Sequence, residues 1–474
     1  MQESRRPFLT KQNVLFFFTD DQRFDTIAAL GHPEIQTPNM DKLARRGTSF
    51  TQAHIPGGTV GAVCMPSRAM LHTGRSLFRL EADGASIPDH HTLLGELLQQ
   101  AGYRTFGIGK WHNGPASYNR SFSDGDEIFF GGMSDHWNVP ACRYDPGGAY
   151  AQVNRRIDNP FHQNTISLQR ADHVQLGKHS SELFSERAAR WLEEEAAAAD
   201  GSPFFMYISY LAPHDPRSMP EEYLQMYDPA KLSLPDNCCA EHPFDYGVRD
   251  IRDETLAPYP RSEQEIRRHL AEYYAMITHL DHELGNVLDA LERSGQADQT
   301  LIVLAGDNGL AVGQHGLMGK QSAYEHSVRV PLILAGPGIP AGETRDTYAY
   351  LYDIYPTLCE LLGLQTPDSV EGTSLAPALG DPAWRAREHL YFAYADCVRA
   401  VKDKRYKLIE YRTDELRRTQ LFDLIADSAE CHDLYGTAGT EEVVKALSRH
   451  LLACKEAWDD EAHPAGGRFW RLYA

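Results

Sequence analysis

The sequence has no long apolar segment. Its longest early apolar run, Val14 to Phe18, is the length of a strand, whereas a helix needs roughly 18 or more apolar residues to cross a bilayer. Residues 1–12 also lack the apolar core of a secretory signal. We therefore expect no membrane partner and, for the sequence as given, a cytoplasmic protein; a trimmed signal would instead indicate a periplasmic or secreted one.

Basic residues are scarce relative to acidic ones. The 46 Lys and Arg against 66 Asp and Glu give a formal net charge of −20, which argues against nucleic acid as a partner because that binding needs a basic surface. A small anionic substrate is not excluded, since a few converging cations make one pocket positive. The eight cysteines form no Cys-x-x-Cys pair, so neither a zinc site nor a dense disulfide framework is indicated.

What the sequence does contain is an alternation of strand and helix patterns. Asn13–Thr19 is a continuous apolar run, typical of a strand buried on both faces. Thr37 and Pro38 suit the start of a helix that ends before Gly47. Such alternation predicts an α/β fold with a large, mostly parallel sheet between helices. The further expected strands are 104–108, 203–210, 300–305 and 330–334, and the further expected helices are 91–101, 180–199, 263–293 and 353–362.

The pattern changes after residue 385. Short segments such as HLYFAYAD and RYKLIEYR follow one another and precede an expected helix at 441–454. We therefore predict a large α/β/α domain, residues 1–385, and a C-terminal α+β subdomain, residues 386–474, with a small antiparallel sheet. Residues 114–178 are weakly periodic and rich in Gly, Asp, Asn and His, which predicts long loops that either shape a site or are disordered.

Polar residues follow three of the expected strands. Asp20 and Asp21 come after the first, His214 after 203–210, and Asp307 and Asn308 after TLIVLAG. Ligands of such sheets bind beyond the carboxyl ends of the strands. One such residue alone would more often cap a turn, but two pairs of carboxylate and amide oxygens indicate a site for a hard cation such as Ca²⁺ or Mg²⁺.

The stretch GAVCMPSRAMLHTGR, residues 61–75, is the most restrictive motif. Pro66 suits the first turn of a helix, so Cys64 is expected at or just before a helix N-terminus, where negative charge is favoured. That environment would also activate a thiolate. A lone cysteine is usually an inert core residue, but Cys-x-Pro-Ser-Arg followed by Thr-Gly-Arg is far more specific.

This string resembles the signature of the type I sulfatases, a family of the alkaline phosphatase superfamily. Four further segments carry the resemblance over nearly the whole chain: NVLFFFTDDQRFDTI and TPNMDKLARRGTSFTQAH near the start, AGYRTFGIGKWHNG, and LAGDNGLAVGQHGLMGKQSAYEHSVRVPLI. The resemblance implies an alkaline phosphatase-like fold, with residues 1–385 as the catalytic sulfatase domain. The sequence is closest in character to bacterial carbohydrate sulfatases.

The resemblance also implies a mechanism. Cys64 would be oxidised to formylglycine (3-oxoalanine), whose hydrate attacks sulfur and gives a covalent sulfo-enzyme. Calcium, with magnesium as the alternative, would be held by residue 64 together with Asp20, Asp21, Asp307 and Asn308. The positions implied to handle the sulfate are Arg68, Lys110, His112, His214 and Lys320, with His214 protonating the leaving alcohol and His112 acting as the base that eliminates sulfate.

The expected partners are a sulfated saccharide as substrate and a formylglycine-generating maturation enzyme, with the bacterial cytoplasm as the compartment of the sequence as given. His315, Arg23 and Arg217 are expected to contact the alcohol part of the substrate, and Asp215 and the loop histidines His136 and His173 are further such residues.

Three alternatives stay open at this point. The first is a phosphonate or phosphate ester hydrolase of the same superfamily, which would share the metal pocket. The second is a binding protein that keeps the anion pocket without turnover, with Cys64 unconverted. The third is a hydrolase that uses the Cys64 thiolate directly, which would need a partner base but no calcium and so would tolerate chelators.

Overall fold

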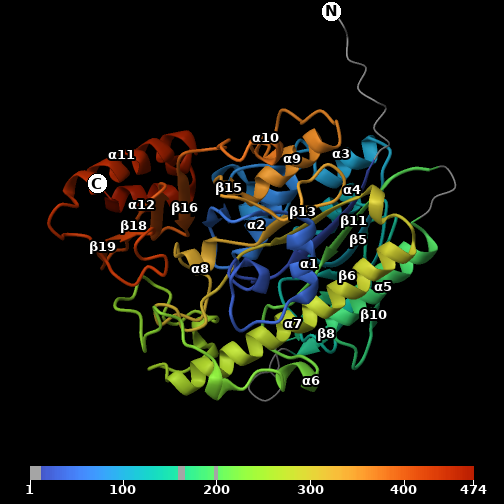
Figure 1. Ribbon diagram of the computed structural model, residues 1–474, viewed down its shortest axis with the longest axis horizontal. Helices are drawn as coiled ribbons and strands as arrows, with labels where there is room; N and C mark the ends of the chain where they lie inside the picture. Colours follow the sequence, from blue (N-terminus) through green and yellow to red (C-terminus); the bar gives the residue numbers. More distant parts are fainter. Residues whose placement is uncertain (1–11, 158–165, 197–200, 474) are drawn as a thin grey trace, which may run out of the picture.

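The computed structural model describes residues 12–157, 166–196 and 201–473. The chain folds around a central mixed sheet with helices on both faces, and a smaller sheet lies toward one end of the molecule (Figure 1). This arrangement confirms the predicted α/β class with a second, mainly antiparallel sheet.

The central sheet is mostly parallel. Strand β1 pairs in parallel with β11 and β12, β11 with β5, and β5 with β6, whereas β13 is antiparallel to both of its neighbours. From edge to edge the order is β14 (Glu343–Arg345), β2 (Gly47–Phe50), β13 (Leu332–Ala335), β12 (Thr300–Gly306), β1 (Asn13–Thr19), β11 (Phe204–Ser209), β5 (Arg104–Trp111) and β6 (Asp124–Phe130).

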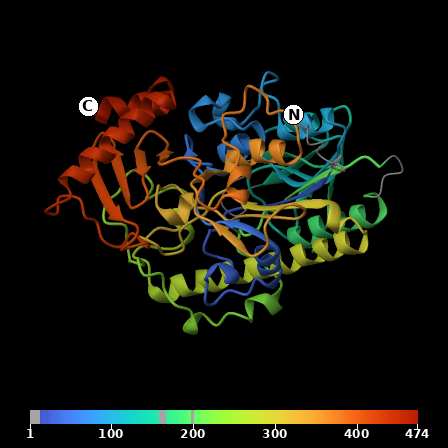
Figure 2. The same ribbon diagram turned by 45° about the horizontal axis from the view of Figure 1, so that its top comes forward.

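Strand β1 is apolar throughout because both of its faces are covered. Val14, Phe16 and Phe18 belong to one buried cluster, and Leu15 and Phe17 belong to the other. Burial on both sides explains the continuous apolar run without alternation. One face of the sheet is covered by α1 (Pro38–Arg46), α5 (Ser180–Glu194), α6 (Glu221–Leu224) and α7 (Glu263–Arg293). The other face is covered by α2 (Cys64–Thr73), α3 (Leu94–Gln100), α4 (Pro115–Ser121), α9 (Ile354–Leu361) and α10 (Ala376–Gly380) (Figure 2).

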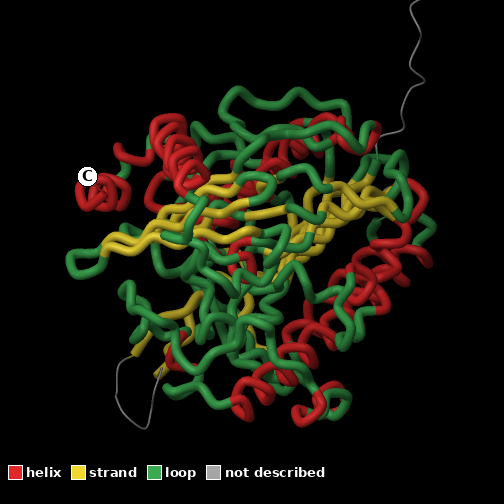
Figure 3. The backbone as a smooth tube through the Cα atoms, turned by 60° about the vertical axis from the view of Figure 1, so that its left-hand side comes forward, coloured by secondary structure: helices red, strands yellow, loops and turns green. Residues whose placement is uncertain are grey.

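The second sheet takes one strand from the N-terminal part of the chain. Its order is β19 (Arg417–Asp423), β18 (Tyr406–Arg412), β17 (Val398–Lys402), β16 (Leu390–Tyr394) and β4 (Gly57–Gly58), with β4 parallel to β16 and the other pairs antiparallel. Helices α11 (Glu441–Ala457) and α12 (Pro464–Tyr473) lie beside it (Figure 3). Leu408 and Phe422 share a buried cluster with Val14. The division at residue 385 stays a prediction.

The region 114–178 contains more regular structure than expected. Besides α4, it supplies β6, the edge strand of the central sheet, so the expectation of loops throughout is wrong there. The acidic start of β6, DGDEIFF, conceals the strand in the sequence. Shorter strands complete the described structure: β3 (Ala53–His54), β7 (Pro140–Ala141), β8 (Val153–Ile157), β9 (Ile166–Arg170), β10 (His173–Val174) and β15 (Ala349–Tyr350).

Other expected elements differ at their ends. Strand β5 continues past residue 108 to Trp111, because a register shift after Ile108 lets it stay paired with β6. The expected helix 180–199 ends at Glu194, and residues 197–200 lie outside the described residues. The remaining helical segments are α8 (Glu325–Val328) and the 3₁₀ turns at 28–30, 77–79, 81–84, 229–231, 254–256, 297–299, 351–353 and 460–462.

Helix α7 is the longest helix of the described residues, and it carries a buried acid. Neither α7 nor any other described helix has both the length and the apolarity needed to cross a bilayer.

Glu283 on α7 is 7% exposed. Burial, helped by the carboxylates of Glu182 and Glu186, raises the pKa of Glu283 to about 7 from its usual 4.5.

The raised pKa of Glu283 predicts a pH-dependent stability. The unfolded chain releases this proton near pH 4.5 and the folded chain near pH 7, so the protein loses stability as the pH rises through that window. We expect Glu283→Gln to raise the free energy of unfolding at pH 8 by about 2 kcal/mol, with no difference below pH 4.5. Denaturant unfolding across the pH range measures this. Asp289→Asn, at an exposed position of the same helix, is the control, and a gain from Glu283→Gln that is equal at every pH would contradict the explanation.

Candidate active site

Two pairs of polar residues, Asp20-Asp21 and Asp307-Asn308, meet at the carboxyl ends of two central strands. Thr19 at the end of β1 lies opposite Gly306 at the end of β12, which brings the residues that follow each strand together. The Asp21 amide donates to Asp307 Oδ1 at 3.0 Å, and Asn308 Nδ2 donates to Asp21 Oδ1 at 2.6 Å. The structure therefore gathers Asp20, Asp21, Asp307 and Asn308 as the strand pattern predicts.

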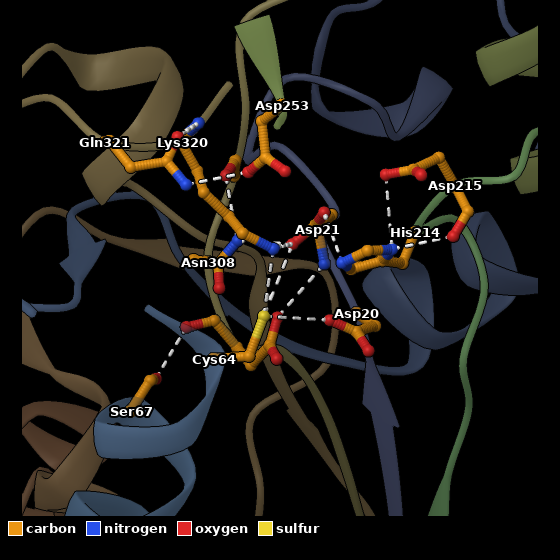
Figure 4. Close-up of polar contacts among 12 residues, drawn as sticks. Asp20, Asp21, Cys64, Ser67, His214, Asp215, Asp253, Asn308, Lys320 and Gln321 are labelled. Carbon is orange, nitrogen blue, oxygen red and sulfur yellow. Dashed lines mark hydrogen bonds and ion pairs between the residues drawn. The ribbon is translucent and has the colours of Figure 1, made fainter. Parts of the chain in front are cut away.

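Cys64 points into this cluster from the first residue of α2. Its side chain is buried, and its Sγ donates to Asp20 Oδ1 at 3.2 Å and accepts from Lys320 Nζ at 3.0 Å (Figure 4). Ser67, one turn further along α2, donates from Oγ to the Asp307 carbonyl at 2.6 Å. That bond holds the N-terminal turn of the helix against the end of β12.

Three buried cations surround the acidic cluster. Arg68 donates from Nε to Asp307 Oδ2 at 3.0 Å, and Lys320 Nζ donates to Asp21 Oδ1 at 2.6 Å. Lys110, near the end of β5, forms an ion pair with Asp20. Each of these side chains is at most 5% exposed, and buried charges of this kind need such partners because burial alone is costly.

Two histidines border the cluster. His214 donates from Nδ1 to the Asp215 carbonyl at 2.8 Å, which leaves its Nε2 facing Asp21 Oδ2 at 3.6 Å. His112 follows β5 directly, and its buried Nδ1 has no hydrogen-bond partner among the described residues. A side chain at Gly132 would meet the His112 ring, since a Cβ atom at that position would lie 2.9 Å from the ring's Nε2.

The charges in the cluster act strongly on one another. Burial would raise the pKa of Asp20, but the charges of Lys110 and Arg68 hold it well below its usual value. Burial and then the charge of Asp20 raise the pKa of Asp307 to about 6. Burial, with Asp20 and Asp307, also raises the pKa of the Cys64 thiol well above its usual value. The direction of this shift is opposite to the one expected for a thiolate activated at a helix N-terminus.

The cluster suits a hard divalent cation. Ligand atoms of Asp20, Asp21, Cys64 and His214 lie within 4.8 Å of one another. Asn308 donates its amide hydrogens to Asp21 and to the Gly309 carbonyl, which leaves its buried Oδ1 without a partner among the described residues. Carboxylate oxygens with one free amide oxygen are the donor set that Ca²⁺ and Mg²⁺ prefer.

Several residues expected to contact substrate are instead seen in contact with other side chains of the protein. Arg23 pairs with Asp25 and lines a separate cavity of about 570 Å³ whose walls include none of the residues around Cys64. Arg217 contacts His269, and the His315 ring stacks on Tyr324 with centroids 3.8 Å apart. The roles of Arg23, Arg217 and His315 stay predictions. His136 is fully buried and bonds Ser180 and the His214 carbonyl, and its expected contact with substrate likewise stays a prediction.

Sequence reasoning missed several polar residues that support the site. Ser209 accepts a hydrogen bond from Arg68 NH1 at 2.6 Å, and its place at the end of β11 was the available signal. Asp253 accepts from Gln321 Nε2 at 2.7 Å beside Lys320 (Figure 4). Nothing in the sequence around Asp253 indicated this, because its segment has neither strand nor helix periodicity.

Comparison with known proteins gives two family matches. Residues 12–364 match the family model described as Sulfatase, and residues 313–457 match the one described as N-sulphoglucosamine sulphohydrolase, C-terminal. The first match covers most of the chain and includes every residue of the cluster around Cys64.

Individual relatives and solved structures are similar to this chain over most of its length. The multifunctional alkaline phosphatase superfamily protein PehA of Trinickia caryophylli is 29% identical, over 94% of this chain and 95% of its own length. The N-acetylglucosamine-6-O-sulfatase of Bacteroides thetaiotaomicron is 25% identical, over 97% of this chain and 88% of its own. The crystal structure of the phosphonate monoester hydrolase of Agrobacterium radiobacter has the same fold, with a TM-score of 0.72, 23% identity, and coverage of 94% of this chain and 96% of that one.

Proposed function

Since this chain belongs to the sulfatase family and is therefore a sulfuric ester hydrolase, we propose that it hydrolyses a sulfate monoester on a carbohydrate. Residue 64, converted from cysteine to formylglycine, is the nucleophile in this proposal, and the reaction passes through a covalent sulfo-enzyme. The observation that carries the proposal is the position of Cys64, whose Sγ lies among Asp20, Asp21 and Lys320 at the start of a helix.

We further propose calcium as the cation, with magnesium as the alternative. Asp20, Asp21, Asp307 and Asn308 would hold it together with residue 64, and the free Asn308 Oδ1 supports this assignment. When bound, such a cation lowers the pKa of a coordinated hydroxyl and offsets negative charge on the substrate. Maturation of Cys64 makes a formylglycine-generating enzyme the second expected partner.

The cations of the chain are suited to the sulfate group. Lys320 lies 3.0 Å from the Cys64 sulfur, so its charge is in place to neutralise an anion bound at residue 64. Arg68 and Lys110 both pair with the neighbouring carboxylate of Asp20. Cations held rigidly around a developing negative charge stabilise a transition state strongly, because no reorganisation is needed.

The two histidines have different proton roles in this proposal. His214 keeps a proton on Nδ1 for the Asp215 carbonyl, so Nε2 is the atom that delivers a proton to the leaving alcohol. Burial lowers the pKa of His214 to about 4, and the negative charge of a bound sulfate ester would raise it. Burial, with the charges of Lys110 and Arg68, lowers the pKa of His112 well below its usual value, which keeps it neutral as a general base.

Relatives support the carbohydrate substrate. One relative that aligns with nearly the whole chain is named for removing a sulfate from N-acetylglucosamine. The phosphonate monoester hydrolase of similar fold keeps a second candidate open, the hydrolysis of phosphonate or phosphate esters.

A comparison of substrates decides between the two candidates. We expect the matured enzyme to have kcat/KM at least about tenfold higher on a sulfated mono- or disaccharide than on phosphate or phosphonate esters of matched alcohols. Some activity on the latter is expected because both anions are tetrahedral. Initial rates over a panel of sulfated saccharides measure this, and a higher kcat/KM on phosphate or phosphonate esters than on every sulfate would reverse the assignment.

A further inference from the structure

Two buried histidines lie against the segment that carries His214. His136 and His179 are both fully buried, and their rings stack in parallel with centroids 5.0 Å apart and planes 6° apart. His136 Nε2 is 2.9 Å from the His214 carbonyl oxygen, and His179 Nε2 is 3.0 Å from the Ser218 carbonyl oxygen. The two rings therefore contact both ends of the segment 214–218.

The hydrogen bonds fix the tautomer of each ring. A carbonyl oxygen only accepts, so both rings must carry their proton on Nε2. The other nitrogens are then acceptors: His179 Nδ1 accepts from the Ser181 amide at 3.2 Å, and His136 Nδ1 accepts from Ser180 Oγ at 2.8 Å. All four ring nitrogens are satisfied, and each ring links the start of α5 to the segment 214–218.

This arrangement bears on the position of the His214 ring. The His214 carbonyl is held by His136, and the ring itself is held by Nδ1 bonding to the next carbonyl, that of Asp215. The His214 amide also donates to the Leu211 carbonyl at 3.0 Å, so loss of the His136 bond removes one of the contacts that direct Nε2 toward Asp21. A proton donor shifted by an ångström loses much of its effect, because proton transfer requires hydrogen-bond distance.

We propose that His136 and His179 are positioning residues that hold the backbone of residues 214–218 so that His214 Nε2 reaches the leaving oxygen of the substrate. The inference rests on the proposed function, in which His214 protonates that oxygen. Neither histidine touches substrate, and both act through His214.

The test uses the dependence of the rate on the leaving group. A sugar alcohol is a poor leaving group and needs a proton from His214, whereas 4-nitrophenolate leaves without one. We expect His136→Phe in the matured full-length enzyme to lower kcat/KM on a monosaccharide sulfate about 100-fold and on 4-nitrophenyl sulfate less than threefold. His136→Gln, whose amide nitrogen can replace Nε2 as donor, should restore the sugar sulfate activity to within about fivefold of wild type.

A matched control comes from a third histidine, His279, whose ring meets His179 edge to face. The His279 and His179 ring centroids are 4.6 Å apart. His279 Nδ1 has no hydrogen-bond partner among the described residues, and its Nε2 lies 3.8 Å from Glu283 Oε1, so neither nitrogen holds the segment 214–218. We expect His279→Phe to leave the ratio of the two activities unchanged. That ratio compares two substrates on one enzyme sample, so it does not depend on the fraction of a variant that folds.

The outcomes separate the positioning role from the proposed function. An equal loss by His136→Phe on both substrates, or an unchanged ratio, would overturn the positioning role while leaving the sulfatase activity intact. A wild-type enzyme that hydrolyses neither sulfate would instead overturn the proposed function itself.

Discussion

The Cys64→Ala variant should lose sulfate ester hydrolysis almost completely, by at least about 10⁴-fold in kcat, the scale seen when a covalent nucleophile is removed. The fold should remain, because Cys64 contributes one small buried side chain and Lys320 keeps its bond to Asp21. Turnover assays and thermal unfolding measure the two effects. Cys64→Ser should also be inactive unless the host converts serine.

The wild-type protein provides the chemical control for that experiment. Mass spectrometry of the peptide spanning residues 61–75 distinguishes a thiol from an aldehyde at Cys64. We expect the aldehyde in protein produced together with a maturation enzyme, and activity in proportion to the converted fraction. Activity that is equal in converted and unconverted protein, or that survives in Cys64→Ala, would refute residue 64 as the nucleophile.

The second large effect is expected at the cation site. Asp307→Ala removes one of the acidic ligands and should lower both calcium affinity and kcat, the latter by about 10³-fold. Calorimetric titration of calcium into the metal-free protein measures binding apart from activity. Asp25→Asn is a suitable control, since Asp25 is also an acid near the end of β1 but pairs with Arg23.

The same site predicts a pH dependence of calcium binding. Since burial and the charge of Asp20 raise the pKa of Asp307 to about 6, protons compete with the cation below that pH. Calcium affinity of the wild-type protein should therefore fall as the pH drops from 7 to 5.

Asp307→Ala protein that binds calcium as tightly as wild type would show that the cation lies elsewhere. Full activity of the wild type after chelation would argue against a cation in the reaction.

The sequence alone predicted the parts of the fold that follow from local patterns. The apolar run of β1 indicated a strand buried on both faces, and the acids after β1 and β12 were expected at one edge because parallel neighbours end together. Cys64 was expected at a helix start from Pro66, and it is the first residue of α2. Short-range rules suffice for these features, since each depends on neighbouring residues or on the direction of adjacent strands.

Local patterns misjudged features that depend on distant contacts. Strand β6 was missed because it gains its pairing from β5 rather than from its own composition. The stacking of His136 on His179 and the cavity beside Arg23 were likewise not indicated by any local pattern. The Cys64 thiol was expected to ionise easily beside a helix N-terminus, whereas burial with Asp20 and Asp307 raises its pKa.

The amino-acid sequence by itself indicated several of the strands and helices in their order along the chain, and the chemical type of the side chains that follow three of those strands. Only the tertiary structure decided which of those side chains share one pocket, which charges pair, and which histidines are buried. The physical reason is that periodicity and capping act within a few residues, whereas burial and electrostatic pairing depend on segments hundreds of residues apart, such as Asp21 and Lys320.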